Sequence, residues 1–174
     1  MTLSNLFPDE EPKCEGDASG RTVAPSATLA RFSPLMDSCG ITRIANVTGL
    51  DSVGIPVALA VRPNSRSVAV SQGKGLSWPA AKASALMESI EVWHAENVQL
   101  PVFYGTARDL SARSPVVDIE LLPHLPGVQR TASDPCLWVE GVELFSQSTM
   151  LVPFEMVHAN YTRPIQPMHG MYPA

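Results

Sequence analysis

Hydrophobic and polar residues follow a helical period most clearly in residues 77–97. At about 100° per residue, Leu86, Ile90 and Trp93 fall on one side of the predicted helix. Ser77 is a suitable N-cap, and most of the residues that follow are strong helix formers. The pattern therefore predicts a long helix with one apolar face.

Three short, mainly apolar segments precede this helix and predict strands: residues 41–48, 55–61 and 67–71. The second is almost continuously apolar, which is typical of a strand buried on both faces. A turn built on Asp51 and Gly54 links the first two strands. Because all the links are short, we expect an antiparallel meander on which the helix lays its apolar face. The predicted fold class is α+β.

The segments on either side carry weaker signals. Residues 25–36 predict a short amphipathic helix that Pro34 kinks or ends. Prolines interrupt residues 105–135, where we expect loops and a short helix at 118–122. Two apolar segments separated by a polar turn then predict a hairpin: residues 137–144 and 150–157.

The two ends of the chain differ from the middle. Residues 1–19 are acidic and carry Pro and Gly, which predicts a mobile arm ahead of a domain spanning 20–174. Residues 163–174 hold three prolines and no closing element. That open end suggests a chain that is cut short.

Length and composition limit the class of protein. The chain has 174 residues, of which 45% are hydrophobic, so it can bury a substantial core. Its net charge of −5 and the lack of a basic stripe argue against nucleic acid as a partner. The sequence shows neither a membrane-length apolar run nor a signal peptide, so we expect a cytoplasmic protein without membrane contact.

The cysteines and histidines show no site pattern. Cys14, Cys39 and Cys136 are odd in number and widely spaced, which indicates neither a disulfide framework nor a zinc site. Each is interpreted as an ordinary reduced thiol. The histidines have no ligand spacing and are interpreted as structural or surface residues: His94, His124, His158 and His169.

The long helix carries a polar stripe opposite its apolar face. Ser84, Glu88 and Glu91 fall within this stripe, and Ala81 and Ala95 leave room for a close approach. Two carboxylates one turn apart repel each other, and a bound cation would relieve the repulsion. The alternative is that both carboxylates simply face water.

A glycine-rich segment lies just before the helix. Gly73 and Gly75 flank Lys74, and glycines in a turn allow backbone N–H groups to point at an anion. The segment is not a Walker A loop, because Gly75 stands where that motif needs Ser or Thr. A plain strand-to-helix turn is the alternative.

Five motifs give the chain a close resemblance to the YcaO family, from about Gly20 to the end. They are Gly40-Ile41-Thr42-Arg43, Val47-Thr48-Gly49-Leu50-Asp51, Gly54-Ile55-Pro56-Val57, Ser71-Gln72-Gly73-Lys74-Gly75 and Ala83-Ser84-Ala85-Leu86-Met87-Glu88-Ser89-Ile90-Glu91. The resemblance implies an incomplete YcaO-like fold, corresponding to the N-terminal half.

The resemblance also implies an activity, the ATP- and Mg²⁺-dependent activation of a peptide-backbone amide. A nucleophile adds to the amide carbonyl, ATP phosphorylates the oxygen, and phosphate leaves. The products are azolines, thioamides or amidines, as in the biosynthesis of modified ribosomal peptides. The implied partners are a peptide or protein substrate, a TfuA-like or leader-peptide-binding protein, and a second copy or complementing chain.

The family's nucleotide and magnesium motif, Ser-x3-Glu-x2-Glu, falls on Ser84, Glu88 and Glu91. The resemblance therefore implies that all three bind ATP and that the two glutamates bind Mg²⁺. The helical stripe selects the same residues independently.

Two further matches are looser. The family uses a basic residue and a hydroxyl seven positions apart near its N-terminus, which Arg21 and Thr28 reproduce. Lys74 matches the glycine-rich turn and is expected to have a supporting role in nucleotide binding. No catalytic residue is assigned.

Two departures from the family pattern affect the expected activity. Val92 stands where the family often has Arg, and family members supply a second acidic helix beyond the point where this chain stops. We therefore expect weak or no turnover from these residues alone. The alternatives are a catalytically silent module that binds a peptide or partner, by β-augmentation for example, and a truncated product without a function of its own.

Overall fold

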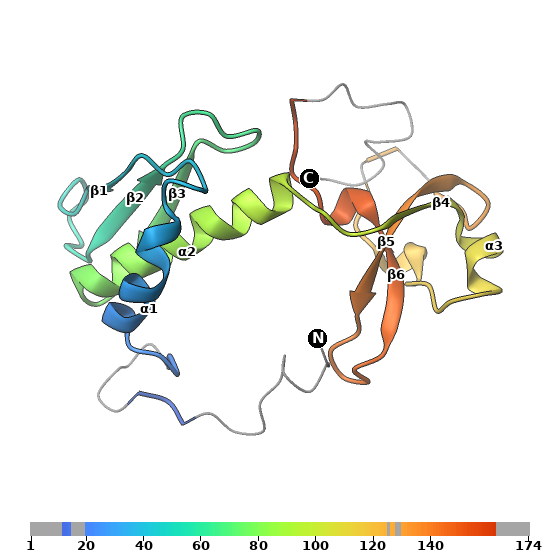
Figure 1. Ribbon diagram of the computed structural model, residues 1–174, viewed down its shortest axis with the longest axis horizontal. Helices are drawn as coiled ribbons and strands as arrows, with labels where there is room; N and C mark the ends of the chain where they lie inside the picture. Colours follow the sequence, from blue (N-terminus) through green and yellow to red (C-terminus); the bar gives the residue numbers. More distant parts are fainter. Residues whose placement is uncertain (1–11, 15–19, 125, 128–129, 163–174) are drawn as a thin grey trace. The chain divides into compact units, whose positions relative to one another are not determined.

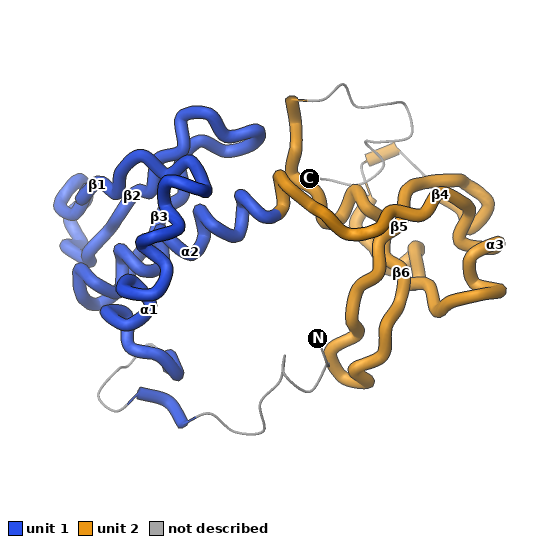
Figure 2. The backbone as a smooth tube through the Cα atoms, in the orientation of Figure 1, with its two compact units in different colours: residues 1–94 blue, residues 95–174 orange. Residues whose placement is uncertain are grey.

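The computed structural model describes residues 12–14, 20–124, 126–127 and 130–162. Most of the predicted arm at 1–19 and the proline-rich end at 163–174 lie outside these residues. The chain divides into two compact units, residues 1–94 and 95–174 (Figure 2). Within the described ranges, no helix has the length and apolar character that crossing a membrane requires.

The first unit is a three-stranded antiparallel sheet with two helices (Figure 1). Its elements are α1 (Pro25–Phe32), the 3-10 turn η2 (Ser33–Leu35), β1 (Arg43–Asn46), β2 (Val57–Val61), β3 (Val70–Lys74) and α2 (Trp78–Glu96). The strand order is β1-β2-β3, so β2 is central and β3 is an edge strand. The predicted meander, the long helix and the α+β class are confirmed.

The helix α2 begins and packs as its sequence pattern predicts. The hydroxyl of Ser77 accepts a hydrogen bond from the backbone N–H of Ala80, with N and Oγ 3.4 Å apart. Leu86 and Ile90 are buried in the core, and Trp93 packs against it. The helix α1 adds Leu29 and Phe32 to the same core, and Met36, just after η2, also packs against it. Its α-helical part ends at Phe32, just before Pro34, as expected.

The two faces of β2 differ in burial. Ala58 and Ala60 belong to the core shared with α2 and are fully buried. On the other face Val57 is buried, whereas Leu59 and Val61 are only half-buried. The expectation of a strand buried on both faces therefore holds only at Val57.

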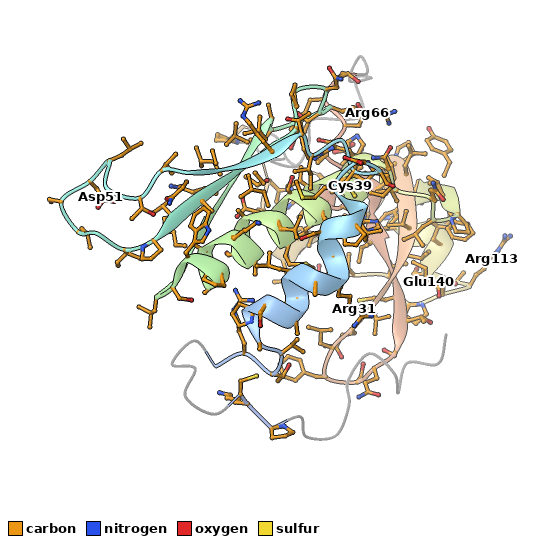
Figure 3. All side chains as sticks on the ribbon, turned by 60° about the vertical axis from the view of Figure 1, so that its left-hand side comes forward. Arg31, Cys39, Asp51, Arg66, Arg113 and Glu140 are labelled. Carbon is orange, nitrogen blue, oxygen red and sulfur yellow. The ribbon has the colours of Figure 1, made fainter. Side chains whose placement is uncertain are left out.

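The turn between β1 and β2 forms around Asp51, as predicted. Its carboxylate accepts hydrogen bonds from the backbone N–H groups of Val53 (2.8 Å) and Gly54 (3.2 Å). Gly54 has φ +74°, a conformation that favours glycine. Asp51 lies near the end of a loop that projects from the sheet (Figure 3).

The predicted bounds of the third strand are wrong. The expected strand at 67–71 lies instead at Val70–Lys74, so Gly73 and Lys74 belong to the strand and not to a turn. Gly73 pairs with Ala58 on one side and packs against α2, where an added Cβ would overlap the backbone of Ala81 and Ala85. Glycine is needed here for close approach between a strand and a helix.

The second unit is another antiparallel sheet, of order β4-β5-β6. Its elements are β4 (Val102–Thr106), α3 (Ala107–Ser111), η3 (Ile119–Leu121), β5 (Pro135–Val142), β6 (Thr149–Pro153) and η4 (Phe154–Met156). The predicted hairpin is β5 and β6, and η3 falls within the short helix expected at 118–122. The sequence pattern did not predict β4 or α3.

Replacing Gly73 by Ala tests the close contact between β3 and α2. The added methyl group would overlap the α2 backbone, so we expect the free energy of unfolding to fall by more than about 2 kcal/mol. Urea denaturation measures the change. Gly141→Ala in β5 is the control, because its Cβ would meet Val152 at an ordinary 3.5 Å. Equal stability of the two variants would contradict the packing described here.

Candidate functional site

The predicted polar stripe lies at the protein surface, beside the part of α2 that packs on β3. Ser84 is half-buried, and Glu88 and Glu91 are exposed, whereas Leu86 and Ile90 of the opposite face are buried. The two carboxylates therefore lie at the surface and not in the apolar interior. The helix holds all three side chains on one side at fixed spacing.

Glu88 is connected to the sheet by a hydrogen bond. Its Oε1 accepts from the backbone N–H of Gln72 in β3, with N and O 3.3 Å apart. Gln72 immediately precedes Gly73, so Glu88 lies beside the glycine-rich segment that the sequence analysis singled out. The stripe and this segment thus meet at one place, through two residues that are 16 positions apart in the chain.

The space beside the alanines of the stripe is filled by the chain itself. We expected Ala81 and Ala95 to leave room for a ligand, but Ala81 is fully buried where Gly73 packs against it. Ala95 is half-buried at the end of the helix. A ligand on this helix therefore has Ser84, Glu88 and Glu91 available, and not the alanine positions.

We expected the Gly-Lys-Gly segment to form a turn that could bind an anion, but Gly73 and Lys74 belong to β3 and Gly75 directly follows it. The N–H of Gly75 donates to the carbonyl of Pro56 at 3.2 Å, and Gly73 lies within the β3 ladder. Because successive side chains of a strand point to opposite faces, Lys74 lies on the face away from α2. It is exposed. The structure does not bring Lys74 to the stripe, and its supporting role stays a prediction.

Thr28 lies within α1, and Arg21 lies just before that helix. Thr28 is 9% exposed, and its hydroxyl donates to the carbonyl of Ala24 in the preceding turn at 3.4 Å. Arg21 is half-buried, and its carbonyl accepts from the N–H of Cys14 at 2.8 Å. These hydrogen bonds are local, so a role of either residue in nucleotide binding also stays a prediction.

The carboxylate oxygens of the stripe suit a magnesium ion that is also bound by phosphate oxygens. Among the described residues, no group of three or more His, Cys, Asp or Glu side chains is arranged to hold a metal. Mg²⁺ is usually bound by one or two carboxylates, with water and phosphate oxygens completing its octahedral coordination. Glu88 and Glu91 meet this requirement, and both carboxylates are accessible from solvent.

The carboxylates with shifted pKa values lie in turns elsewhere. Backbone and hydroxyl donors of Thr131 lower the pKa of Asp134, and donors of Ser146 and Phe145 lower that of Glu143. The N–H of Thr131 lies 2.7 Å from Oδ2 of Asp134. Each shift is explained by its own turn, so neither carboxylate indicates a second site.

The sequence analysis did not identify two charged residues, Arg130 and Glu155, that are buried near Cys136 in the second unit. Arg130 is 5% exposed, Glu155 is 8% exposed, and both act electrostatically on the thiol of Cys136. Burial raises the pKa of Cys136 to about 11, although Arg130 opposes the shift. The thiol is therefore protonated at neutral pH, which agrees with the interpretation of Cys136 as an ordinary reduced thiol.

The fold and the stripe define an α+β protein with a paired-glutamate helix beside a glycine-containing edge strand. The family model described as YcaO cyclodehydratase, ATP- and Mg²⁺-binding, matches residues 72–173, which include the end of β3 from Gln72 onward and all of α2. The chain belongs to the YcaO family, as its motifs indicated.

Several curated relatives match most of this chain. An uncharacterized protein of Mycobacterium tuberculosis is 41% identical over 140 residues, which cover 80% of this chain and 32% of the relative. An uncharacterized protein from the tfuA 3′ region of Rhizobium leguminosarum bv. trifolii is 36% identical over 147 residues, covering 81% of this chain and 34% of the relative. The chain thus spans about a third of the length of these relatives.

Two solved structures resemble the chain. The YcaO of Methanopyrus kandleri bound with AMPPCP and Mg²⁺ is 28% identical with a TM-score of 0.58, and the match covers 86% of this chain and 37% of that one. A heterocyclase in complex with substrate and cofactor is 19% identical with a TM-score of 0.70, covering 95% and 25%. The second likeness supports the fold alone.

The raised pKa of Cys136 predicts how stability depends on pH. An unfolded thiol ionises near pH 9, whereas the folded one ionises near 11, so the folded state binds the proton more tightly between these values. Stability should therefore fall as pH rises from 9 to 11, by up to about 1.4 kcal/mol per pH unit from this group. Cys136→Val should remove that part of the slope, and urea denaturation of both proteins at pH 8, 9 and 10 measures it. Parallel stability profiles would contradict the prediction.

Proposed function

We propose that this chain supplies one wall of an ATP–Mg²⁺ site in a YcaO-type enzyme that activates backbone amides. The observation that carries the proposal is the surface stripe of Ser84, Glu88 and Glu91, with Glu88 connected to β3. The M. kandleri YcaO bound with AMPPCP and Mg²⁺ supports it, since that protein shares the fold at 28% identity.

Each residue of the stripe has a proposed role that its chemistry allows. Glu88 and Glu91 would hold Mg²⁺ through their exposed carboxylates, and the hydroxyl of Ser84 would donate to a phosphate oxygen. When bound, the metal would offset part of the negative charge of the phosphates. The helix contributes rigidity, because residues on successive turns of one helix keep their spacing without a cost in loop entropy.

The proposed reaction follows from the difficulty of expelling oxygen from an amide. A nucleophile adds to the carbonyl carbon and loses its proton, and the resulting oxygen takes the terminal phosphoryl group of ATP with release of ADP. That oxygen then leaves as part of inorganic phosphate. With a neighbouring Cys, Ser or Thr side chain the product is an azoline, and with a sulfur donor it is a thioamide. The substrate is a peptide or protein, with a TfuA-like partner for delivery as one candidate.

The proposal includes a requirement for further residues. Because the chain spans about a third of its curated relatives, the remaining ligands of the nucleotide would come from outside these residues. We propose weak binding of ATP by this chain and turnover only with a complementing polypeptide. A cytoplasmic location is part of the same proposal.

A second candidate function is peptide capture at the edge of the second sheet. β4 is an edge strand, and it exposes Val102, Phe103 and Tyr104 at 44%, 42% and 60%. An edge strand with exposed apolar side chains can accept an extended peptide by β-augmentation. The β3 edge is less suitable, since Glu88 already accepts the N–H of Gln72.

Exchanging both glutamates for glutamine tests the first proposal. The double variant Glu88→Gln, Glu91→Gln keeps the shape of the stripe but removes two negative charges, so binding of Mg²⁺ with AMPPCP should weaken by more than about tenfold. An NMR titration detects such binding even when it is millimolar. The melting temperature without ligand should not change, because both side chains are exposed. Unchanged affinity would remove the proposed site.

The two serines of α2 provide a matched pair. Ser84→Ala should weaken AMPPCP binding and leave stability unchanged, because this half-buried hydroxyl belongs to the stripe. Ser89 is fully buried, and its hydroxyl has no hydrogen-bond partner, so Ser89→Ala should leave binding unchanged and keep or raise stability by about 1 kcal/mol. Thermal denaturation and the same titration distinguish them. The reverse pattern would contradict the assignment of the two faces.

A further inference from the structure

The backbone amide of Gln72 points to the free edge of the first sheet. Just beyond the two ends of β3, the N–H of Gly75 donates to the carbonyl of Pro56, and the carbonyl of Ala69 accepts from the N–H of Arg62. Because hydrogen bonds to a partner strand alternate along an antiparallel strand, the odd-numbered residues face β2 and Gln72 faces outward. An outward N–H on an edge strand has no ladder partner, and here it donates to Glu88.

The distance from this amide to Glu88 is set by the packing of Gly73. A Cβ at Gly73 would overlap Ala81 and Ala85, so the strand lies directly on the helix backbone. Glu88 follows Ala85 by three residues and therefore lies on the same side of α2, about one turn further along. Without this close contact, the Glu88 side chain could not reach the edge of β3 in the same way.

A single hydrogen bond changes what the carboxylate can do. A carboxylate has two oxygens with about four acceptor positions, so an amide at Oε1 leaves Oε2 available to a cation. The side chain is exposed, and an exposed Glu otherwise samples several rotamers. The Gln72 amide reduces that freedom and selects one orientation of the carboxylate beside Ser84 and Glu91.

We propose that the backbone N–H of Gln72, held in place by the packing of Gly73 on α2, is a positioning group for the metal-binding carboxylate of Glu88. This inference rests on the proposed function and adds to it the group that orients the ligand. Outer hydrogen-bond partners of metal ligands commonly contribute 10-fold to 100-fold to affinity. A backbone amide can serve here because this role needs no particular side chain at position 72.

The hydrogen bond itself can be tested without metal. Glu88→Ala should increase the hydrogen-exchange rate of the Gln72 amide by about threefold to tenfold, as expected for loss of one net hydrogen bond. Glu91→Ala is the matched control, because it removes the same charge from the same stripe. It leaves the Glu88 acceptor in place, so the exchange rate of the Gln72 amide should not change. An exchange rate that is unaffected by Glu88→Ala would overturn the proposal.

The positioning role is tested by replacing the amide with an ester. A hydroxy-acid analogue of glutamine at position 72 removes the N–H and keeps the side chain, and an ester at Val70 removes another outward N–H of the same strand. Mg²⁺ is titrated in the presence of AMPPCP and followed by NMR. We expect the ester at 72 to weaken Mg²⁺ binding by about tenfold and the ester at 70 to leave it unchanged, with both proteins remaining folded at the temperature of the titration.

The outcomes separate this inference from the function on which it rests. Equal Mg²⁺ affinity for the two esters, with loss of affinity in Glu88→Gln, would overturn the positioning role and leave the metal site in place. Unchanged affinity in Glu88→Gln together with Glu91→Gln would overturn both. Selective weakening by the ester at 72 would support both.

Discussion

The contact between β3 and α2 is the constraint on which the first unit depends. Gly73 lies so close to the helix that no side chain fits between the backbones of the two elements. Such contact is possible only because Ala81 and Ala85 are small and Gly73 has no Cβ. The same small residues place Ala58 and Ala60 of the central strand in one core with Leu86 and Ile90.

This constraint places the polar stripe at the edge of the sheet. The face of α2 that carries Ala81 and Ala85 is covered by β3, and Glu88 extends the same face beyond the covered part. A mobile loop could not hold two carboxylates and a hydroxyl at constant spacing, whereas a helix packed on a sheet can. The close packing thus forms the core and also orients the proposed site.

Much of the fold could be predicted because its signals are local. Ser77 and the apolar spacing of Leu86 and Ile90 define α2, and the turn at Asp51 implies that the strands on either side of it pair in antiparallel fashion. The position of β3 could not be read in this way, since only its pairing with β2 and its contact with α2 place Gly73 inside the strand. β4 was missed for a similar reason: it is short, largely exposed, and defined by its pairing with β5.

The candidate site was predictable in part. The stripe follows from helical geometry, so Ser84, Glu88 and Glu91 were found from their spacing alone. The tertiary contacts were not predictable: alternation along β3 turns Lys74 away from the helix, and the Gln72 amide reaches Glu88 only because of the packing at Gly73. A glycine in a strand, together with two alanines four residues apart in the next helix, is typical of close packing between strand and helix. Gly73, Ala81 and Ala85 have this pattern, which could have indicated the contact.

The central claim is that a metal-bound nucleotide lies on this stripe. Adding Mn²⁺ with AMPPCP to the ¹⁵N-labelled chain would show where the metal binds, because a paramagnetic ion broadens the NMR signals of nearby amides. The account predicts that the amides of residues 84–91 and of Gln72 broaden first. Broadening that begins in β5 and β6, or that is uniform along the chain, would contradict it.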